Sequence, residues 1–300
     1  MATLYTHQSQ NVRKTWFLMT TFLVLIVIIG FAFSQYFGNS NILYFFFVFA
    51  LLMNIYAYWN SDKLAIKLSG AFLADENQYR ELHNIVENLS ITAGIPKPRV
   101  YIINDSAPNA FATGRDKDHS AIAVTTGLLQ ILNRTELEGV IAHELSHIGN
   151  RDILVSTVAV VLAGFITIAA DFFIRSQIFG GRSRDDNNSN GGILMIIGII
   201  LAILAPIFAS LIQLSISRKR EFLADASGAL LTRYPEGLAS ALAKISEYGA
   251  PMQKASKATA HLFIANPFGV NKIKSLFSTH PPVADRIQAL LGKVATKDTE

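Results

Sequence analysis

The chain has 300 residues, of which 51% are hydrophobic and only 16% are charged. Soluble domains average about 25% charged residues, so this composition argues against an ordinary soluble protein. The formal net charge is +4 and suits a chain that lies against anionic lipid, whereas the scattered basic residues give no basis for nucleic-acid binding. Cysteine is absent, which excludes disulfides, thiolate metal ligands and cysteine nucleophiles.

The first predicted elements are two transmembrane helices. The stretch Thr15–Ser61 contains no charged residue, and a helix needs about 20 mostly apolar residues to cross a bilayer. The turn-forming sequence GNSN divides this stretch into predicted spans at Thr15–Phe37 and Ile42–Tyr58. We interpret the first span as a retained anchor and not as a cleaved signal peptide, because its apolar run is long and a second span follows closely.

The segment Asn60–Asp152 has the pattern of a soluble unit with helices and strands. Apolar residues recur at helical spacing over Tyr79–Leu89, and Gly94 with the prolines that follow it predicts the end of this helix. Short runs rich in strand-forming residues then predict three extended pieces, at Arg99–Ile103, Asn109–Thr113 and Ala121–Val124.

A second apolar hairpin follows. Charged residues are absent from Ile153–Ala170 and from Asn187–Ser217, which predicts spans at Ile153–Ile174 and Ile193–Leu214. A polar, glycine-rich loop separates the two spans. Three further helices are predicted after this hairpin, at Arg218–Leu231, Gly237–Tyr248 and Pro282–Leu291.

The distribution of basic residues predicts the orientation of the chain. Cytoplasmic loops of membrane proteins carry an excess of Lys and Arg. The ends of the predicted hairpins that would face the cytoplasm are flanked by Arg13, Lys14, Lys63, Lys67, Arg218, Lys219 and Arg220. We therefore expect both termini and the segment Asn60–Asp152 in the cytoplasm, and the loop Arg175–Gly192 outside.

The sequence HELSH, His143–His147, is the clearest candidate for chemistry. The preceding TELE, Thr135–Glu138, matches a capping box and predicts a helix from about Glu136 through His147. On a helix, histidines four residues apart share a face and can bind one ion, with Glu144 beside them. Catalytic zinc sites use three protein ligands and keep one position open. The sequence thus predicts a zinc site; the alternative is a pair of surface histidines next to the membrane.

A third ligand has to come from elsewhere in the chain. Cysteine is excluded, and Ile153 stands where the extended HExxHxxGxxH motif requires a histidine. The downstream acidic candidates are Asp152, Asp171, Asp185, Asp186, Glu221, Asp225, Glu236, Glu247 and Asp285. Membrane geometry favours Glu221, because this residue and His147 both lie roughly 10 Å from the hydrocarbon edge if the spans form a hairpin. Asp225, four residues on, is a candidate acceptor for a histidine N–H. The alternative for Glu221 is an ion pair with a neighbouring Arg or Lys.

The motifs HELSHIGNRD, SRKREFLADA, NAFATG and THPP, with the two hydrophobic hairpins around the first of them, resemble the HtpX-type membrane zinc metalloproteases, which are related to the CAAX prenyl endopeptidases. The resemblance covers nearly the whole chain. It implies one Zn²⁺ bound by His143, His147 and Glu221, with Glu144 as the catalytic base and acid. It also implies a multi-pass protease of the bacterial plasma (inner) membrane, acting on misfolded or damaged membrane proteins in the heat-shock response.

The predicted fold class is a mainly α membrane protein with a zincin-type α+β catalytic domain. It has four transmembrane helices in two hairpins and a small edge sheet. The predicted organisation is an N-terminal hairpin, a catalytic segment with the HExxH helix, a second hairpin and a catalytic segment with the third ligand, at residues 1–60, 61–152, 153–215 and 216–300.

Two further sets of residues are candidates for a role in hydrolysis. His280 and Arg286, in THPPVADR, are candidate transition-state stabilisers; the alternative is a turn histidine and a surface arginine. The run Asn109, Ala110, Phe111, Ala112 is a candidate edge strand that holds an extended substrate by backbone pairing; the alternative is a plain connecting strand.

Two other classes of function compete with an endopeptidase. An inactive membrane scaffold would keep the fold without the chemistry, but it would have no need for Glu144. A small transporter would need polar groups at mid-membrane, and the predicted spans contain a single ionisable residue, Asp171. We therefore expect an enzyme whose partners are polypeptide substrates and the lipid bilayer.

Overall fold

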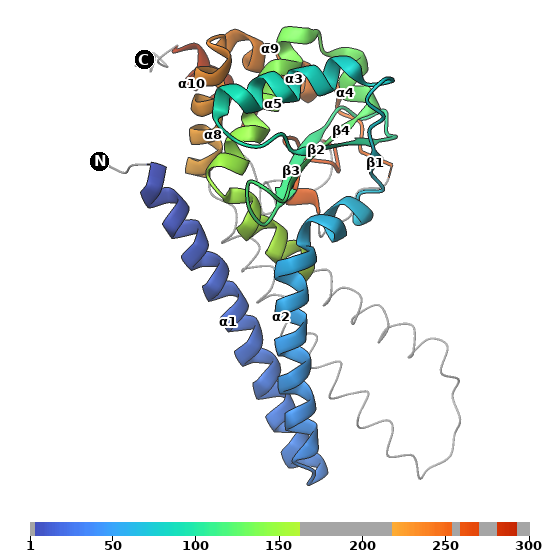
Figure 1. Ribbon diagram of the computed structural model, residues 1–300, viewed down its shortest axis with the longest axis vertical. Helices are drawn as coiled ribbons and strands as arrows, with labels where there is room; N and C mark the ends of the chain where they lie inside the picture. Colours follow the sequence, from blue (N-terminus) through green and yellow to red (C-terminus); the bar gives the residue numbers. More distant parts are fainter. Residues whose placement is uncertain (1–3, 163–217, 254–258, 270–280, 293–300) are drawn as a thin grey trace, which may run out of the picture.

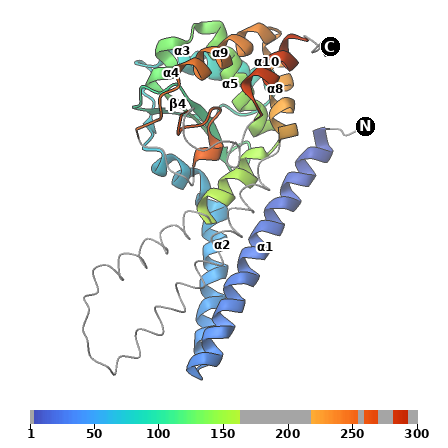
Figure 2. The same cartoon turned by 180° about the vertical axis from the view of Figure 1, so that it is seen from behind.

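A computed structural model describes residues 4–162, 218–253, 259–269 and 281–292. A long helical hairpin projects from one side of an α+β domain (Figure 1), and both views show the N-terminal end of this hairpin beside the domain (Figure 2). The predicted span Ile193–Leu214, most of the span Ile153–Ile174 and the candidate His280 lie outside the described residues.

The hairpin consists of α1 (Leu4–Phe37) and α2 (Asn41–Leu68). Both helices contain a stretch long and apolar enough to cross a membrane, within Ser9–Gln35 and Asn41–Asn60, which confirms the first two predicted spans. At 1.5 Å per residue, the 34 residues of α1 measure about 51 Å, well beyond the roughly 30 Å hydrocarbon core. The first turns of α1 can therefore contact the α+β domain while the rest of the helix crosses the bilayer.

The small sheet has four strands, β1 (Phe72–Leu73), β2 (Arg99–Ile103), β3 (Ala110–Gly114) and β4 (Ser120–Thr125). Their order is β1-β2-β4-β3, with β2 and β4 parallel and the outer pairs antiparallel. The three predicted extended pieces are confirmed as β2, β3 and β4. The two-residue β1 is too short to leave a sequence pattern.

The helices of the domain match the predicted ones, with one short helix in addition. They are α3 (Arg80–Ala93), α4 (Thr126–Ile131), α5 (Arg134–Gly149), α8 (Arg218–Thr232), α9 (Pro235–Tyr248) and α10 (Val283–Leu291), and a 3-10 turn, η1, covers Ala260–Leu262. Gly94 ends α3 in the left-handed conformation, φ 64°, as its position in the sequence predicts. The short α4 was not predicted.

The predicted capping box of α5 at Thr135–Glu138 is wrong by two residues. The helix is capped by Asn133, whose side chain accepts from the backbone N–H of Glu136 at 3.0 Å, while the Glu136 carboxylate accepts from the backbone N–H of Asn133 at 2.9 Å. Both registers fit the capping pattern. Packing selects Glu136, because α9 donates to its carboxylate from Lys244 at 2.8 Å and from Ser240 at 2.6 Å.

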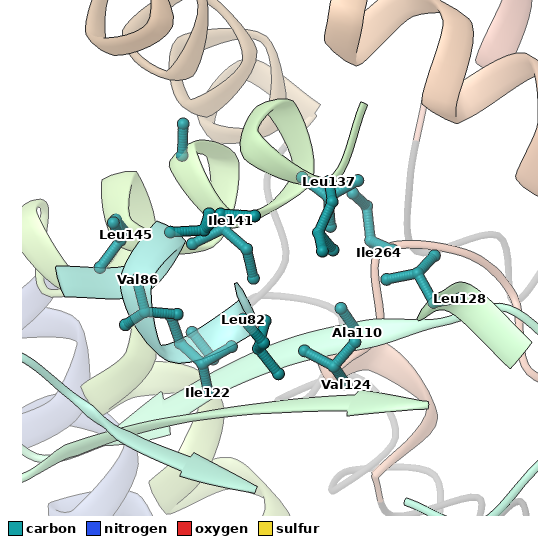
Figure 3. Packing of buried hydrophobic residues seen from close by; sticks show 14 of the residues in the cluster. Leu82, Val86, Ala110, Ile122, Val124, Leu128, Leu137, Ile141, Leu145 and Ile264 are labelled. Carbon is teal, nitrogen blue, oxygen red and sulfur yellow. The ribbon is translucent and has the colours of Figure 1, made fainter. Parts of the chain in front are cut away.

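The core of the domain surrounds α5. This helix packs on the sheet and α3 through residues that include Ile141 and Leu145, and α9 covers it from another side (Figure 3). Each buried aliphatic side chain contributes roughly 1.5–3 kcal/mol. Gly139 allows close contact between α5 and α9, since a Cβ at this position would lie 2.7 Å from the backbone nitrogen of Leu238. The position of α5, and of the histidines on it, is thus fixed by packing.

A sharp corner follows α5. The chain turns through 82° into a helix whose described part is Asp152–Leu162. Arg151, within the turn, has φ 58°, a left-handed conformation that non-glycine residues rarely adopt. The helix after the corner packs against the hairpin through Leu154, Val158 and Leu162. Among the described residues there are thus two candidate spans, or three if α5 and this helix count as one bent span.

Candidate metal centre and active site

The helix α5 brings the two motif histidines together. His143 and His147 lie one turn apart, and their Nε2 atoms are 3.2 Å from each other. His143 is almost completely buried, and the His147 side chain is 15% exposed. The structure therefore supports the convergent pair that the HExxH spacing predicts.

The helix α8 places Glu221 against this pair. One carboxylate oxygen of Glu221 is 3.6 Å from His147 Nε2, and the other is 3.9 Å from His143 Nε2. Asp225 and Gly228 continue the same face of α8 at helical spacing. Gly228 permits the close approach of the two helices, since a Cβ there would lie 3.0 Å from the backbone nitrogen of His143. The glutamate selected from membrane geometry is the one that reaches the histidines.

Each histidine is oriented by a carboxylate on its other ring nitrogen. His143 Nδ1 lies 2.9 Å from Asp225, and His147 Nδ1 lies 3.1 Å from Asp152. With both Nδ1–H groups donating to carboxylates, both Nε2 lone pairs point into the same small space. Asp225 lies where the sequence predicted such an acceptor. In the sequence, Asp152 was only one of the candidate third ligands. Its role in orienting His147 could not be predicted, because the contact depends on the corner after α5.

The three converging residues offer ligand atoms at separations that suit a zinc ion. Zinc binds histidine nitrogen and carboxylate oxygen at about 2.0–2.2 Å, so tetrahedral ligand atoms lie about 3.3–3.6 Å apart. Here the two Nε2 atoms are 3.2 Å apart, one Glu221 oxygen is 3.6 Å from His147 Nε2, and the other Glu221 oxygen is 3.9 Å from His143 Nε2. Two facing imidazole lone pairs cannot hydrogen-bond to each other, and a cation between them resolves the conflict. The donor set thus matches a three-ligand zinc site with one open position.

The carboxylates around the site favour a bound cation. Burial alone would lower the pKa of His147, but the hydrogen bond that His147 donates to Asp152 and the negative charges of Glu221, Asp152 and Glu144 raise this pKa to about 9. Burial alone would raise the pKa of Asp225, but its bonds to Arg286 and His143 hold it at about 2. A proton on His147 and a metal ion would therefore compete for the same place.

Glu144 lies beside the ligands and is fixed to the sheet. It is 2% exposed, and the backbone of Ala112 in β3 hydrogen-bonds to its carboxylate. Burial raises the pKa of Glu144, which the charges of the two histidines partly oppose. Glu144 lines one cavity together with Ala112, His143, His147, Glu221 and His261. The Glu144 carboxylate thus belongs to the same cavity as the three residues that converge on one point.

Arg286 is fully buried, so the surface alternative for this residue is wrong. Its Nε and one terminal nitrogen donate to the two oxygens of Asp225 at 2.8 and 2.6 Å, and the other terminal nitrogen donates to the carbonyl of Ile264 at 3.4 Å. These bonds hold Asp225, which in turn holds His143. The geometry favours a role in positioning Asp225, while direct stabilisation of a transition state remains a prediction.

Only one of the four predicted substrate-strand residues lines the cavity. The Asn109 amide bonds to the backbone of Ala265, the carbonyl of Ala110 accepts from Ile264, and Phe111 packs on Phe263. Residues 259–269 thus cover the outer edge of β3 where this strand begins. The proposal of substrate pairing is thereby narrowed to Ala112, next to Glu144.

The fold and the site together define a zinc metalloprotease with membrane helices. The profile of the family described as "Peptidase family M48" matches residues 76–294. The chain is 52% identical to "Protease HtpX homolog" of Caldanaerobacter subterraneus subsp. tengcongensis, over 96% of this chain and 97% of that protein. It is 49% identical to "Protease HtpX homolog" of Pyrococcus furiosus, over 92% and 94%. The chain belongs to peptidase family M48, among its HtpX homologs.

A solved structure has a similar fold. The crystal structure of S. mikatae Ste24p superimposes with a TM-score of 0.50 over 97% of this chain, at 19% sequence identity. This chain spans 66% of the length of that one. At this sequence identity the similarity concerns the fold alone, and it confirms the predicted relation to that structural class.

Proposed function

We propose that the protein is a membrane-bound zinc endopeptidase that hydrolyses misfolded or damaged membrane proteins in stress quality control. Its active site would face the cytoplasm at the bacterial plasma membrane. One observation carries the proposal: His143, His147 and Glu221 converge on one point, with Glu144 beside them. A structural zinc site or an inactive scaffold would have no use for a buried carboxylate in that place.

The chain's own residues supply proton transfer and orientation. Zinc, when bound, lowers the pKa of its water to about 7 and polarises a carbonyl oxygen. Glu144 would accept the proton that a water molecule releases as it attacks the scissile carbonyl carbon, and would then deliver this proton to the departing amide nitrogen. Asp152 and Asp225 keep the two imidazoles oriented with their Nε2 atoms toward the site.

The burial of the site supports an unfolded substrate. His143 is 1% exposed and Glu144 2% exposed, so a peptide bond can reach them only as part of a flexible segment. The cavity also includes Ile153 and Ser156, which belong to the helix that packs on the membrane hairpin. A segment released from a damaged membrane protein would therefore reach the site close to the bilayer.

Metal-dependent cleavage of an unfolded chain tests this function. We expect the purified, zinc-loaded protein to cleave reduced and alkylated lysozyme but not native lysozyme, which has the same sequence in folded form. Chelation should abolish the cleavage, and added zinc should restore it. Equal cleavage by the chelated protein, after contaminating proteases are excluded, would contradict the proposal.

Labelling of single cysteines tests the orientation. The chain has no cysteine, so each engineered one is unique. Asn39 is exposed at the turn between α1 and α2, and Asp118 is exposed between β3 and β4 of the α+β domain. We expect a membrane-impermeant maleimide to label Asn39→Cys on intact cells and Asp118→Cys only after permeabilisation. The reverse pattern would place the active site outside the cytoplasm.

A further inference from the structure

The first membrane helix inserts one polar side chain into the surroundings of the zinc site. Asn11 of α1 is 2% exposed. Its amide nitrogen donates to the carbonyl of Asn150 at 3.0 Å and to the carboxylate of Asp152 at 2.7 Å. These partners lie 139 and 141 residues further along the chain. Both hydrogens of the amide group are thus used to hold the corner that follows α5.

The corner is where the orientation of His147 is decided. One carboxylate oxygen of Asp152 accepts a hydrogen bond from the Asn11 amide. The other oxygen lies 3.1 Å from His147 Nδ1. The turn contains Arg151 in a left-handed conformation, so its geometry depends on contacts from outside. Asn11 supplies two such contacts, one on each side of Arg151.

The same amide also connects to the helix that carries the third ligand. Arg220 lies next to Glu221 on α8. One of its terminal nitrogens donates to the side-chain oxygen of Asn11 at 3.3 Å and to the carboxylate of Asp152 at 3.2 Å. Asn11 therefore contacts both elements whose spacing sets the site: the corner after α5 and the start of α8.

We propose that Asn11 is a positioning residue of the zinc site, which holds Asp152 and, through it, His147. The first membrane helix is then a structural part of the metal centre and not only an anchor. Asn11 lies outside residues 76–294, the part of the chain that matches the family profile. The inference rests on the zinc site of the proposed function, but it does not depend on the substrate or on the orientation of the protein.

A double-mutant cycle on zinc affinity tests the inference. The dissociation constant is measured on the full-length protein by competition with a chelator. Mutation of a residue that hydrogen-bonds to a zinc ligand typically lowers the zinc affinity about 10- to 100-fold. Asn11 acts one step further out, through Asp152, so we expect about 10-fold weaker zinc binding for Asn11→Leu. If Asn11 acts through Asp152, adding Asn11→Leu to Asp152→Asn should weaken binding by less than about twofold.

A second buried asparagine in the same hairpin provides the matched control. Asn54 of α2 is 6% exposed and donates to the carbonyl of Met19, within the hairpin. We expect Asn54→Leu to leave zinc affinity within about twofold of wild type, the margin that the cycle resolves. Thermal unfolding of the metal-free proteins verifies the fold, and Asn11→Ala replaces Asn11→Leu if the leucine variant does not fold.

The outcomes separate this inference from the proposed function. Wild-type affinity in Asn11→Leu would overturn the inference, as would equal losses in Asn11→Leu and Asn54→Leu. Full additivity with Asp152→Asn would also overturn it, because Asn11 would then act by another route. If the wild type binds no zinc, or His147→Ala keeps its zinc, the proposed function itself fails.

Discussion

The Glu144→Gln variant is expected to bind zinc as tightly as the wild type and to cleave an unfolded substrate about 10²- to 10⁴-fold more slowly. Glutamine has nearly the size of glutamate and keeps an oxygen to accept the hydrogen bond from the Ala112 backbone, so the surrounding structure is preserved. It cannot accept a proton from an attacking water. The three converging donors are not changed, so zinc stays bound.

A second glutamate on the same helix provides the control for this result. Glu138 lies on α5 and forms an exposed pair with Arg134 at 3.0 Å. Glu138→Gln makes the same chemical change away from the cavity, and we expect it to leave the cleavage rate unchanged. Initial rates of cleavage and zinc content are measured on both variants and the wild type. A Glu144→Gln protein that cleaves at the wild-type rate would show that another group is the base.

The largest effect on stability is expected for Arg286→Leu. This change leaves the Asp225 carboxylate, which is 2% exposed, without its two strongest hydrogen-bond donors. Breaking a buried ion pair in this way costs about 3–5 kcal/mol of unfolding free energy. Denaturant titration of the metal-free protein in detergent measures the loss. Zinc affinity should fall as well, because Arg286 then no longer holds Asp225 in the position from which it orients His143.

Two further variants distinguish the ion pair from a general packing defect. Replacing both partners, Arg286→Leu with Asp225→Leu, removes the unpaired charge and should recover much of the stability, but not the zinc affinity. Arg134→Leu breaks an exposed pair with Glu138 and should cost no more than about 1 kcal/mol. Equal losses for Arg286→Leu and for the double variant would contradict this account of Arg286.

The features that the sequence predicted well depend on local spacing or on the membrane. The four-residue spacing of His143 and His147 determines a shared helix face, whatever the rest of the fold. Glu221 could be selected from a distance because the two spans predicted between His147 and Glu221 would return the chain to the same side of the membrane at a similar depth. The first two spans follow from composition alone.

The features that the sequence missed depend on contacts between distant segments. The role of Asp152 requires the corner at Arg151, whose conformation no residue pattern indicates. The burial of Arg286 depends on Asp225, 61 residues earlier. The capping box was misplaced because Asn133 and Thr135 both fit the pattern, and only the packing of α9 on Glu136 decides between them.

The central claim is that one zinc ion lies between α5 and α8, bound by His143, His147 and Glu221. The most direct test is the zinc content and affinity of Glu221→Ala beside wild type and Glu247→Ala, a change of an exposed glutamate on α9. We expect one zinc per chain in the wild type and in Glu247→Ala. For Glu221→Ala we expect the zinc affinity to fall by more than about 100-fold, because residues that only hydrogen-bond to a metal ligand already change the affinity by up to about 100-fold. Full retention of zinc by Glu221→Ala would contradict the account.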